Sequence, residues 1–549
     1  MIIKTEYTCG DIEYKASGAE TKHFSIIKKE KDNCLTLKIL PNRDIKFKKF
    51  QLIFNYEYDD NCRIFVNGYQ SWTDSREYFK TEYMSHLHPL SKKRIMKHPM
   101  HNAGDYSFKK YPSRGGIFYG WSYGYVRLDD HVELFGSVTE KCGFTSITFD
   151  TVNKKVVIEK DLEGVTVNEG YKVIQLFRMK GTMDEVFDGY FDAMNIPKPR
   201  VSPKCGYTTW YNYYPDINEQ IVTDDLEALA ATGEKIDIFQ IDDGYQTAVG
   251  DWLSVDKNKF PNGMKAIADK IHSKNMLAGL WLAPFGCQID SVVAKEHPDW
   301  LIKDSDGNPV NCGGNWGGFY ALDISVPEAA AYIKNFFDVI LNKWGYDMVK
   351  LDFLYAACVV PNKGKSRGQL MCEAMNFIRE CVGDKLILGC GVPLAPAFGK
   401  VDFCRIGADV DLSWKTNLYE KMKHREDVST KNTINCTIFR RELNGRAFLN
   451  DPDVFLLRDY NISMKEEQRK LVAKINKLFG GLLFISDNTD KYSAEQLENF
   501  KETIAKDDIK ILKAEYVLPK IMEIKYSLNG EEHLFRFNSD NGKILSGKI

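Results

Sequence analysis

The strongest constraint on the fold is a series of eight short apolar runs between residues 205 and 487, separated by amphipathic segments. This rhythm is typical of buried parallel strands joined by helical crossovers. Eight such units over this length match a closed (β/α)8 TIM barrel, whereas a doubly wound sheet would usually show a Gly-rich phosphate loop after its first strand. None is visible. The predicted strands are 205–211, 236–242, 277–283, 347–353, 386–390, 403–409, 446–451 and 480–487.

The clearest helix is predicted directly after Ser325. The hydroxyl of Ser325 and the carboxylate of Glu328, three residues later, would form a capping box at its first turn. The apolar side chains that follow recur at helical spacing, so they predict one face packed on the barrel. That face comprises Ile333, Phe336, Phe337, Ile340, Leu341 and Trp344.

The segments on either side of the barrel read as β structure. Up to about residue 190, short alternating stretches such as 35–39 and 155–159 are separated by Gly, Asn and Asp turns. Three prolines, at positions 197, 199 and 203, then form a stiff connection. Alternation returns at 516–526 and 533–537. We therefore expect an N-terminal antiparallel domain (1–195), the barrel (196–489) and a small C-terminal β domain (490–549).

Composition restricts the compartment and the partners. The 549 residues carry a formal net charge of -2, without the basic excess that binding to a phosphate backbone requires, so nucleic acid is not an expected partner. The 13 cysteines form no CxxC pair, which favours reduced thiols over a disulfide framework. The first residues lack an export signal, and no apolar stretch is long enough to span a membrane. We predict a cytoplasmic protein.

Acidic residues end five of the eight predicted strands. In a TIM barrel the reacting groups lie at the carboxyl ends of the strands, so this edge is the expected active site. A single aspartate there is ordinarily a helix N-cap, but five strands ending in this way exceed that explanation. The carboxylates concerned are Asp242, Asp243, Asp352, Asp409, Asp451 and Asp487.

Two pairs within these strands suggest chemistry. Side chains alternate along a strand, so Lys350 and Asp352 should point to the same side, where the ammonium would keep the carboxylate ionised as a nucleophile requires. A purely structural ion pair is the alternative. Arg405 and Asp409 should also share a side, with Gly407 leaving room for a ligand between them. The arginine would lower the pKa of Asp409, whereas a general acid needs it raised, and the sequence leaves that conflict open.

Aromatic residues near these positions could stack on a sugar or belong to the core. They are Trp210, Tyr211, Trp252, Trp281 and Trp414. A group of histidines in the N-terminal region has no thiol partners at zinc-finger spacing, so a zinc site is not favoured. The histidines are His86, His88, His98 and His101. The barrel aspartates could hold Mg²⁺, but a lysine beside Asp352 argues against that. No metal or other cofactor is expected.

Six motifs in order along the chain resemble glycoside hydrolase family 36, in its shorter bacterial α-galactosidase form. They are Asn67-Gly-Tyr-Gln-Ser-Trp72, Phe239-Gln-Ile-Asp-Asp-Gly-Tyr245, Gly279-Leu-Trp-Leu-Ala-Pro284, Lys350-Leu-Asp-Phe353, Leu388-Gly-Cys-Gly391 and Arg405-Ile-Gly-Ala-Asp409. The resemblance implies an N-terminal β-sandwich, a central barrel and a C-terminal β domain. It also implies a retaining exo-α-galactosidase that acts on raffinose- or melibiose-type oligosaccharides.

The resemblance further implies a role for each matching residue. Asp352 would be the nucleophile and Asp409 the acid/base. Asp242 and Asp243 would hold the 4- and 6-hydroxyls of galactose, and Trp281 would pack against the sugar. The remaining binding residues would be Lys350, Cys390 near the 2-hydroxyl, Arg405, and Trp72 as a lid from this or a neighbouring subunit. Whether the chain forms a homo-oligomer stays open.

Other functions are compatible with parts of this pattern. An α-N-acetylgalactosaminidase or an α-galactosyltransferase would use the same two aspartates and differ only in the pocket. A sugar-binding protein that had kept the barrel but lost catalysis is disfavoured by the intact pair, Asp352 and Asp409. An Mg²⁺-dependent lyase would be inactivated by a chelator, whereas a glycosidase would not.

Overall fold

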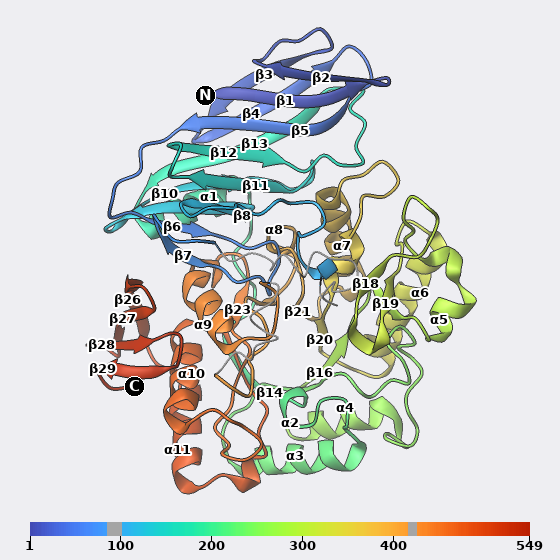
Figure 1. Cartoon of the computed structure of the whole chain (residues 1–549). Coiled ribbons are helices and arrows are strands. Elements are labelled where there is room, and N and C mark those ends of the chain that lie inside the picture. The colour runs from blue at the N-terminus through green and yellow to red at the C-terminus, as the bar shows by residue number, and fades with distance from the viewer. Residues whose placement is uncertain (85–100, 415–424) are drawn as a thin grey trace.

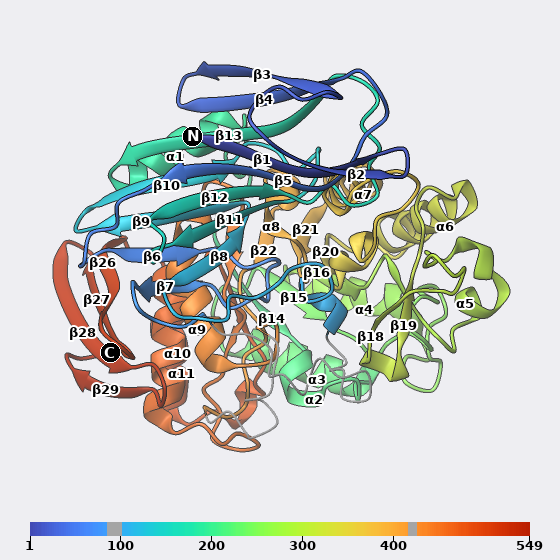
Figure 2. The ribbon, with the colours of Figure 1, turned by 45° about the horizontal axis from the view of Figure 1, so that its top comes forward.

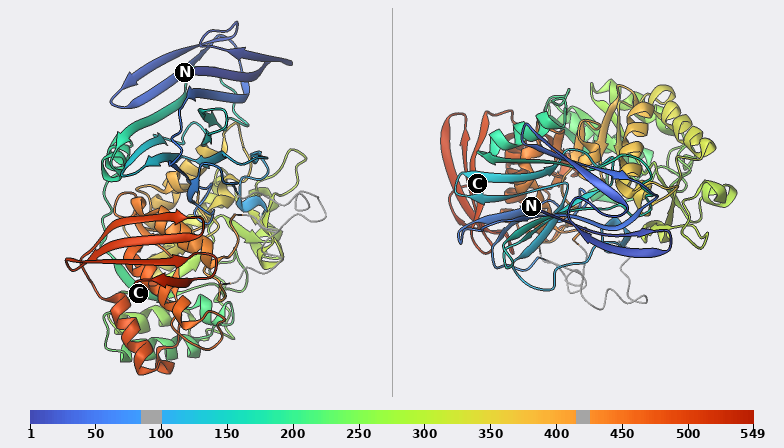
Figure 3. Two further views of the ribbon diagram at one scale, coloured as in Figure 1. Left: turned by 60° about the vertical axis from the view of Figure 1, so that its left-hand side comes forward. Right: turned by 90° about the horizontal axis from the view of Figure 1, so that it is seen from above.

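The computed structural model describes residues 1–84, 101–414 and 425–549. Two antiparallel sheets from the first third of the chain lie above a parallel barrel, and a smaller sheet lies beside the barrel near the C-terminus (Figure 1). The same arrangement is visible when the molecule is tilted or turned (Figures 2 and 3). The predicted fold, a TIM barrel flanked by β domains, is confirmed.

The N-terminal sheets have the strand orders β2-β1-β5-β12-β11-β8 and β3-β4-β13-β10-β9-β6-β7. Alternate residues of β4, namely Leu35, Leu37 and Ile39, are buried, as expected for a sandwich whose inner faces form the core. Helix α1 (Met183–Ala193) packs on β10 and β13. The strands are β1 (Ile2–Cys9), β2 (Ile12–Ser17), β3 (Phe24–Lys31), β4 (Cys34–Pro41), β5 (Lys46–Asn55), β6 (Arg63–Val66), β7 (Arg76–Phe79), β8 (Ile117–Trp121), β9 (Tyr123–Leu128), β10 (His131–Ser137), β11 (Thr145–Asp150), β12 (Lys155–Lys160) and β13 (Tyr171–Gly181).

The barrel contains all eight strands expected from the apolar runs. Its order is β23-β22-β21-β20-β16-β15-β14-β25-β24, and every pairing is parallel. Strands β23 and β24 are separated by only residues 452 and 453, so the two ends of the sheet meet and the barrel closes. The strands are β14 (Lys204–Thr208), β15 (Ile238–Ile241), β16 (Leu277–Leu282), β20 (Met348–Leu351), β21 (Leu386–Gly389), β22 (Phe403–Arg405), β23 (Leu449–Asp451), β24 (Val454–Phe455) and β25 (Leu482–Ile485).

Helices surround the barrel, with buried apolar side chains on their inner faces. They are α2 (Trp210–Tyr213), α3 (Glu219–Ala231), α4 (Gly263–Ser273), α5 (Val292–Glu296), α6 (Pro327–Asp338), α7 (Arg367–Val382), α8 (Leu394–Ala397), α9 (Thr430–Phe439), α10 (Glu466–Phe479) and α11 (Ala494–Ile504). None of the helices in the described parts of the chain combines the length and the apolar character that a membrane span needs.

Helix α6 occurs where the sequence predicts it, but its cap differs. The helix begins at Pro327, and its N-cap is Val326, which makes no side-chain capping bond. The expected capping box of Ser325 and Glu328 is therefore wrong, because the Ser325 hydroxyl donates to the carboxylate of Asp323 instead. The helix continues as a π-helical turn over Val339–Lys343, which keeps the predicted apolar face buried as far as residue 341.

Two smaller sheets complete the structure. Between β16 and β20, the strands β17 (Gly286–Gln288), β18 (Asn311–Gly313) and β19 (Phe319–Ala321) form an excursion beside the barrel. The C-terminal sheet consists of β26 (Ile509–Leu518), β27 (Ile521–Leu528), β28 (Glu531–Asn538) and β29 (Lys543–Ser546). The segment expected to be β structure from residue 490 begins instead with α11, which packs on α10. The boundaries of the three domains remain predictions.

Candidate active site

A cavity of about 410 Å³ opens at the carboxyl ends of the barrel strands. Its wall combines carboxylates, one lysine and several aromatic rings. Seven of the nine site residues predicted from the sequence line it, whereas Cys390 and Arg405 do not. The lining residues are Trp72, Trp210, Asp242, Asp243, Trp281, Gly314, Asn315, Trp316, Lys350, Asp352, Phe353, Asp409, Glu426, Asp427 and Val428.

Parallel pairing explains why residues distant in sequence meet in this cavity. The two aspartates Asp242 and Asp243 follow β15, Trp281 lies in β16, and Asp352 directly follows β20. The three strands are consecutive neighbours in the sheet, and β21 and β22 continue the order toward Asp409. Since all strands run in the same direction, their last side chains converge at one end of the barrel.

Asp352 is buried at the base of the cavity. Its carboxylate accepts hydrogen bonds from the backbone N–H of Phe353 at 2.9 Å and from the indole N–H of Trp281 at 3.2 Å. Burial raises the pKa of Asp352 above its ordinary value, while the charge of Lys350 and hydrogen bonds from Cys390 and Phe353 act in the opposite direction. The expectation that Lys350 would dominate is therefore wrong, although Lys350 and Asp352 do share a side of the strand.

The ammonium of Lys350 forms its ion pair with a different carboxylate. Its Nζ lies 2.7 Å from Oδ2 of Asp242, and both side chains are buried. Burial by itself would raise the pKa of Asp242, but the lysine, together with hydrogen bonds from Gln240 and the N–H of Asp243, more than offsets it, so the pKa lies below its ordinary value. Asp242 is thus held ionised at the cavity wall.

Asp243 is held from a loop that the sequence did not single out. The indole N–H of Trp316 donates to Oδ2 of Asp243 at 2.8 Å, and Gln246 donates to Oδ1 at 2.5 Å. Trp316 has a left-handed backbone, with φ of 54°. It lies between β18 and β19 in a stretch with two glycines on each side, Gly313-Gly-Asn-Trp-Gly-Gly318. The sequence signal that could have identified Trp316 is a tryptophan within a glycine-rich loop, because glycine allows the backbone to pack closely around a site.

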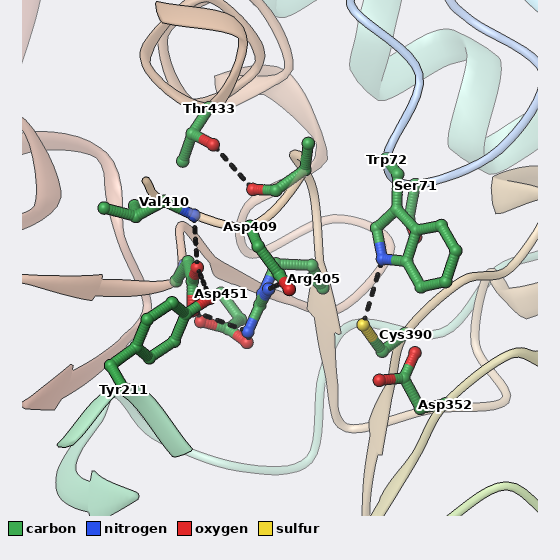
Figure 4. Close-up of polar contacts among 12 residues, drawn as sticks. Ser71, Trp72, Tyr211, Asp352, Cys390, Arg405, Asp409, Val410, Thr433 and Asp451 are labelled. Carbon is green, nitrogen blue, oxygen red and sulfur yellow. Dashed lines mark hydrogen bonds and ion pairs between the residues drawn. The ribbon is translucent and has the colours of Figure 1, made fainter. Parts of the chain in front are cut away.

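Arg405 does not line the cavity but contacts Asp409, which does (Figure 4). Its Nη1 donates to Oδ1 of Asp409 at 2.7 Å, and its other nitrogens contact Asp451 and Asp453. The expected ligand space beside Gly407 does not exist. A Cβ at this glycine would lie 3.0 Å from Cα of Thr433, so the absence of a side chain lets α9 pack closely.

Trp72 reaches the site from the N-terminal sandwich of the same chain. Its indole N–H donates to Sγ of Cys390 at 3.2 Å (Figure 4), and its ring packs edge-on against Phe353. A Cβ at Gly391 would meet this ring at 2.9 Å. Burial raises the pKa of the Cys390 thiol well above its ordinary value, so the sulfur remains protonated. Cys390 is thus covered by Trp72 and connects it to Asp352.

The loop that carries Trp72 is fixed to the barrel by Arg440, whose side chain is completely buried. The guanidinium donates to Oδ1 of Asn67 at 2.9 Å, to the carbonyl of Gln70 at 3.0 Å and to the carbonyl of Ser71 at 2.6 Å. A fourth bond, at 2.7 Å, reaches the carbonyl of Ile406 in the barrel. One side chain at the end of α9 therefore ties the Asn67–Trp72 motif to the strand that precedes Asp409.

Glu426 is a second wall residue that the sequence did not predict, because it follows no strand. Its carboxyl accepts hydrogen bonds from Thr73 at 2.7 Å and from Tyr106 at 2.5 Å, both in the N-terminal region. Burial, reinforced by the charge of Asp105, raises the pKa of Glu426 to about 7. The wall beside Trp72 thus holds a carboxylic acid that titrates near neutrality.

The other candidates divide between cavity and core. Trp210 lines the cavity, whereas Trp252 and Trp414 are buried elsewhere in the core, and Tyr211 is buried against Asp453. Asp487 pairs with Arg458 away from the cavity. The side chains of His86, His88, His98 and His101 lie outside the described residues. Among the residues that are described, no three His, Cys, Asp or Glu side chains are grouped as a metal site would require.

The comparisons with known proteins agree with this geometry. The melibiase family model matches residues 206–376. A blood-group A α-D-galactosamine galactosaminidase of Flavonifractor plautii is 32% identical over 31% of this chain and 17% of its own length, and an α-galactosidase of Escherichia coli is 29% identical over 29% and 23%. These alignments thus span about a fifth of each relative.

The solved α-galactosidase of Thermus thermophilus, in complex with p-nitrophenyl α-D-galactopyranoside, matches at nearly full length. It is 25% identical, with a TM-score of 0.72, and the alignment covers 96% of this chain and 98% of that one. This similarity and the melibiase match agree with the resemblance to glycoside hydrolase family 36 that the sequence motifs carry. A family 36 α-galactosidase of Geobacillus stearothermophilus shares the fold, with a TM-score of 0.61 at 13% identity. These similarities agree with the barrel, the sandwich that contributes Trp72 and the carboxylates of the cavity.

Proposed function

We propose that the protein is a retaining exo-α-galactosidase that releases terminal α-linked galactose from oligosaccharides. The observation that carries this proposal is the cavity itself, in which Asp352 and Asp409 reach one space bounded by Trp281, Trp316 and Trp72. Similarity to the Thermus α-galactosidase over nearly the whole chain supports the substrate class. A complex of that enzyme with stachyose supports an α-galactosyl oligosaccharide as the natural substrate.

In the proposed reaction, Asp352 attacks the anomeric carbon while Asp409 protonates the departing glycosidic oxygen. Asp409 then removes a proton from water, which hydrolyses the galactosyl-enzyme ester with net retention. Asp352 must be ionised for the first step. The N–H groups of Phe353 and Trp281 and the nearby Lys350 stabilise the carboxylate against its burial. Two carboxylates and a water molecule complete this mechanism, so it needs no cofactor.

We assign sugar recognition to the two carboxylates that follow β15. Asp242, ionised beside Lys350, and Asp243, oriented by Trp316, would accept hydrogen bonds from the 4- and 6-hydroxyls. Trp281 would pack on the apolar face of the galactose ring. Arg405, which contacts three carboxylates and does not line the cavity, would act by holding Asp409.

The position of Cys390 favours galactose over N-acetylgalactosamine. If this residue lies near the sugar 2-hydroxyl, as the family resemblance implies, an acetamido group would need space that Trp72 fills. The galactosaminidase among the relatives is named for galactosamine, so a sugar with a nitrogen substituent at position 2 is the alternative, which the acetamido sugar tests. The 13 free thiols support a reducing compartment such as the cytoplasm.

The test is turnover of p-nitrophenyl α-galactoside, α-glucoside and α-N-acetylgalactosaminide by the wild-type protein and by Asp352→Ala, with EDTA present. We expect release from the galactoside only, and its loss in the variant. Azide should restore turnover of Asp352→Ala with formation of β-galactosyl azide, because azide then attacks in place of the missing nucleophile. Activity on the α-N-acetylgalactosaminide alone would reassign the substrate to N-acetylgalactosamine. No turnover of any of the three glycosides would refute the proposal.

A further inference from the structure

Three carboxylates surround the single guanidinium of Arg405. Its Nη1 lies 2.7 Å from Asp409, its Nε 3.1 Å from Asp451 and its Nη2 2.7 Å from Asp453. The side chains of Asp451 and Asp453 are fully buried, whereas that of Asp409 is 37% exposed to the cavity. One positive charge therefore balances three acids, and two of these have no access to solvent.

Asp453 occupies an unusual position between β23 and β24. Its φ of 75° lies in the left-handed region, which costs free energy for a residue other than glycine and persists only where contacts enforce it. Its Oδ2 accepts a hydrogen bond from the backbone N–H of Val410 at 2.8 Å and another from the hydroxyl of Tyr211. Its own N–H donates to Asp451 at 2.9 Å. Asp453 is thus fixed on every side, and one of its contacts is the residue that follows Asp409.

We propose that Asp453 is a positioning residue for the acid/base Asp409, which it orients through the backbone of Val410 and through the guanidinium of Arg405 that both carboxylates contact. The inference rests on the proposed glycosidase function. Asp453 does not line the cavity, so it exchanges no proton with the substrate. The proton moves from Asp409 to the glycosidic oxygen and returns from water, and Asp453 acts only on the position of Asp409 and on the arginine that both contact.

The charges around Asp453 support this role. The titratable and charged groups that face it are Arg405 of β22, Asp409, Asp451 of β23 and Tyr211 of α2. Burial and the two neighbouring carboxylates raise the pKa of Asp453 to about 7, against the effects of Arg405 and Tyr211. Once Asp453 is ionised, its negative charge offsets part of the positive charge of Arg405 and repels the carboxylate of Asp409. An ionised Asp453 therefore competes with Asp409 for the one guanidinium that both contact.

The experiment compares the pH profiles of kcat/KM for wild type and Asp453→Asn. Asparagine adopts the left-handed backbone readily, so the substitution removes the charge and keeps the conformation. Melibiose is the substrate, because its poor leaving group requires protonation and so exposes the alkaline limb set by Asp409. We expect this limb to move to lower pH by about one unit in the variant, the size of effect that a nearby like charge produces.

Asp487→Asn is the matched control, since Asp487 is equally buried at the end of a barrel strand but pairs with Arg458. It should lower thermal stability without moving the alkaline limb. Tyr211→Phe is a second, milder variant: it removes the hydroxyl that stabilises ionised Asp453, so the limb should move in the same direction by a smaller amount. Coincident limbs for wild type, Asp453→Asn and Tyr211→Phe would overturn the inference. Wild-type protein inactive on every galactoside would overturn the proposed function instead.

Discussion

Substitution of Arg440 should loosen the Trp72 lid without touching the cavity. Arg440 is fully buried and does not line the cavity, yet it donates four hydrogen bonds, three of them to the Asn67–Trp72 loop. In Arg440→Lys the positive charge remains, but a compact ammonium cannot reproduce the planar fork of a guanidinium. The loop should then separate from the barrel more readily.

The magnitude follows from the bonds that are lost. A hydrogen bond to a charged group contributes about 1.5–3 kcal/mol, and a buried oxygen left without a donor adds its own penalty. Lysine can keep one or two of the four bonds, so we expect a loss of roughly 3–4 kcal/mol in the free energy of unfolding. Withdrawal of the Trp72 ring should weaken sugar binding by about 1.5 kcal/mol, which is roughly a tenfold rise in KM.

The assay combines Michaelis–Menten kinetics on p-nitrophenyl α-galactoside with denaturant unfolding. If Arg440 acts through the lid, the rise in KM should be non-additive with that of Trp72→Ala, because the double variant has no ring left to displace. Arg441→Met is the control. Arg441 also lies at the C-terminal end of α9, but it pairs with Glu442 and does not contact the loop. An unchanged KM in Arg440→Lys, or full additivity with Trp72→Ala, would refute the reasoning.

Three further predictions concern the cavity wall. Lys350→Met should lower the free energy of unfolding by about 3–5 kcal/mol at pH 7.5, because the buried Asp242 carboxylate loses its ion-pair partner. The loss should be smaller at pH 5, where that carboxylate takes up a proton. Urea unfolding at both pH values tests this. Trp316→Phe should lower kcat/KM about tenfold with an unchanged circular dichroism spectrum, because the N–H to Asp243 is removed while an aromatic ring remains at the cavity wall. Glu426 keeps a proton up to about pH 7 in the folded state, against a reference pKa of 4.5, so its environment destabilises the fold increasingly from pH 4.5 to 7. Glu426→Gln should therefore match wild type in melting temperature at pH 5 and exceed it at pH 8, and equal differences at both pH values would contradict this.

The sequence predicted the barrel well, because its signal is local. Each strand is a short apolar run, and a run such as Ile238–Ile241 predicts a buried strand without knowledge of the segments that pack against it. The strand-end aspartates followed from the same rule, since parallel pairing must bring Asp242 and Asp352 to one end of the barrel. The sequence therefore predicted which carboxylates lie at that end of the barrel.

The sequence could not supply the partners of those groups. Strand alternation places Lys350 and Asp352 on one side, but whether the ammonium contacts Asp352 or Asp242 depends on the distance between strands β20 and β15, which lie on either side of β16. Trp316 and Glu426 lie on loops, whose positions depend on tertiary packing and leave no periodic trace. The cap of α6 failed for a similar reason, since the N–H and the hydroxyl of Ser325 both donate to the carboxylate of Asp323 and the hydroxyl caps no helix N–H.

The bond between Arg440 and Asn67 joins residues 373 positions apart. At ribosomal rates of 5 to 20 residues per second, about 20 to 75 seconds pass between the synthesis of the two ends of this bond. During that interval the sandwich can fold, but its Asn67–Trp72 loop has no barrel to dock on and leaves an indole ring exposed. Catalytic competence should therefore arise late and abruptly, once α9 and the last barrel strand, β25, have emerged from the ribosome. A nascent chain that stalls before residue 440 would be a natural client for chaperones.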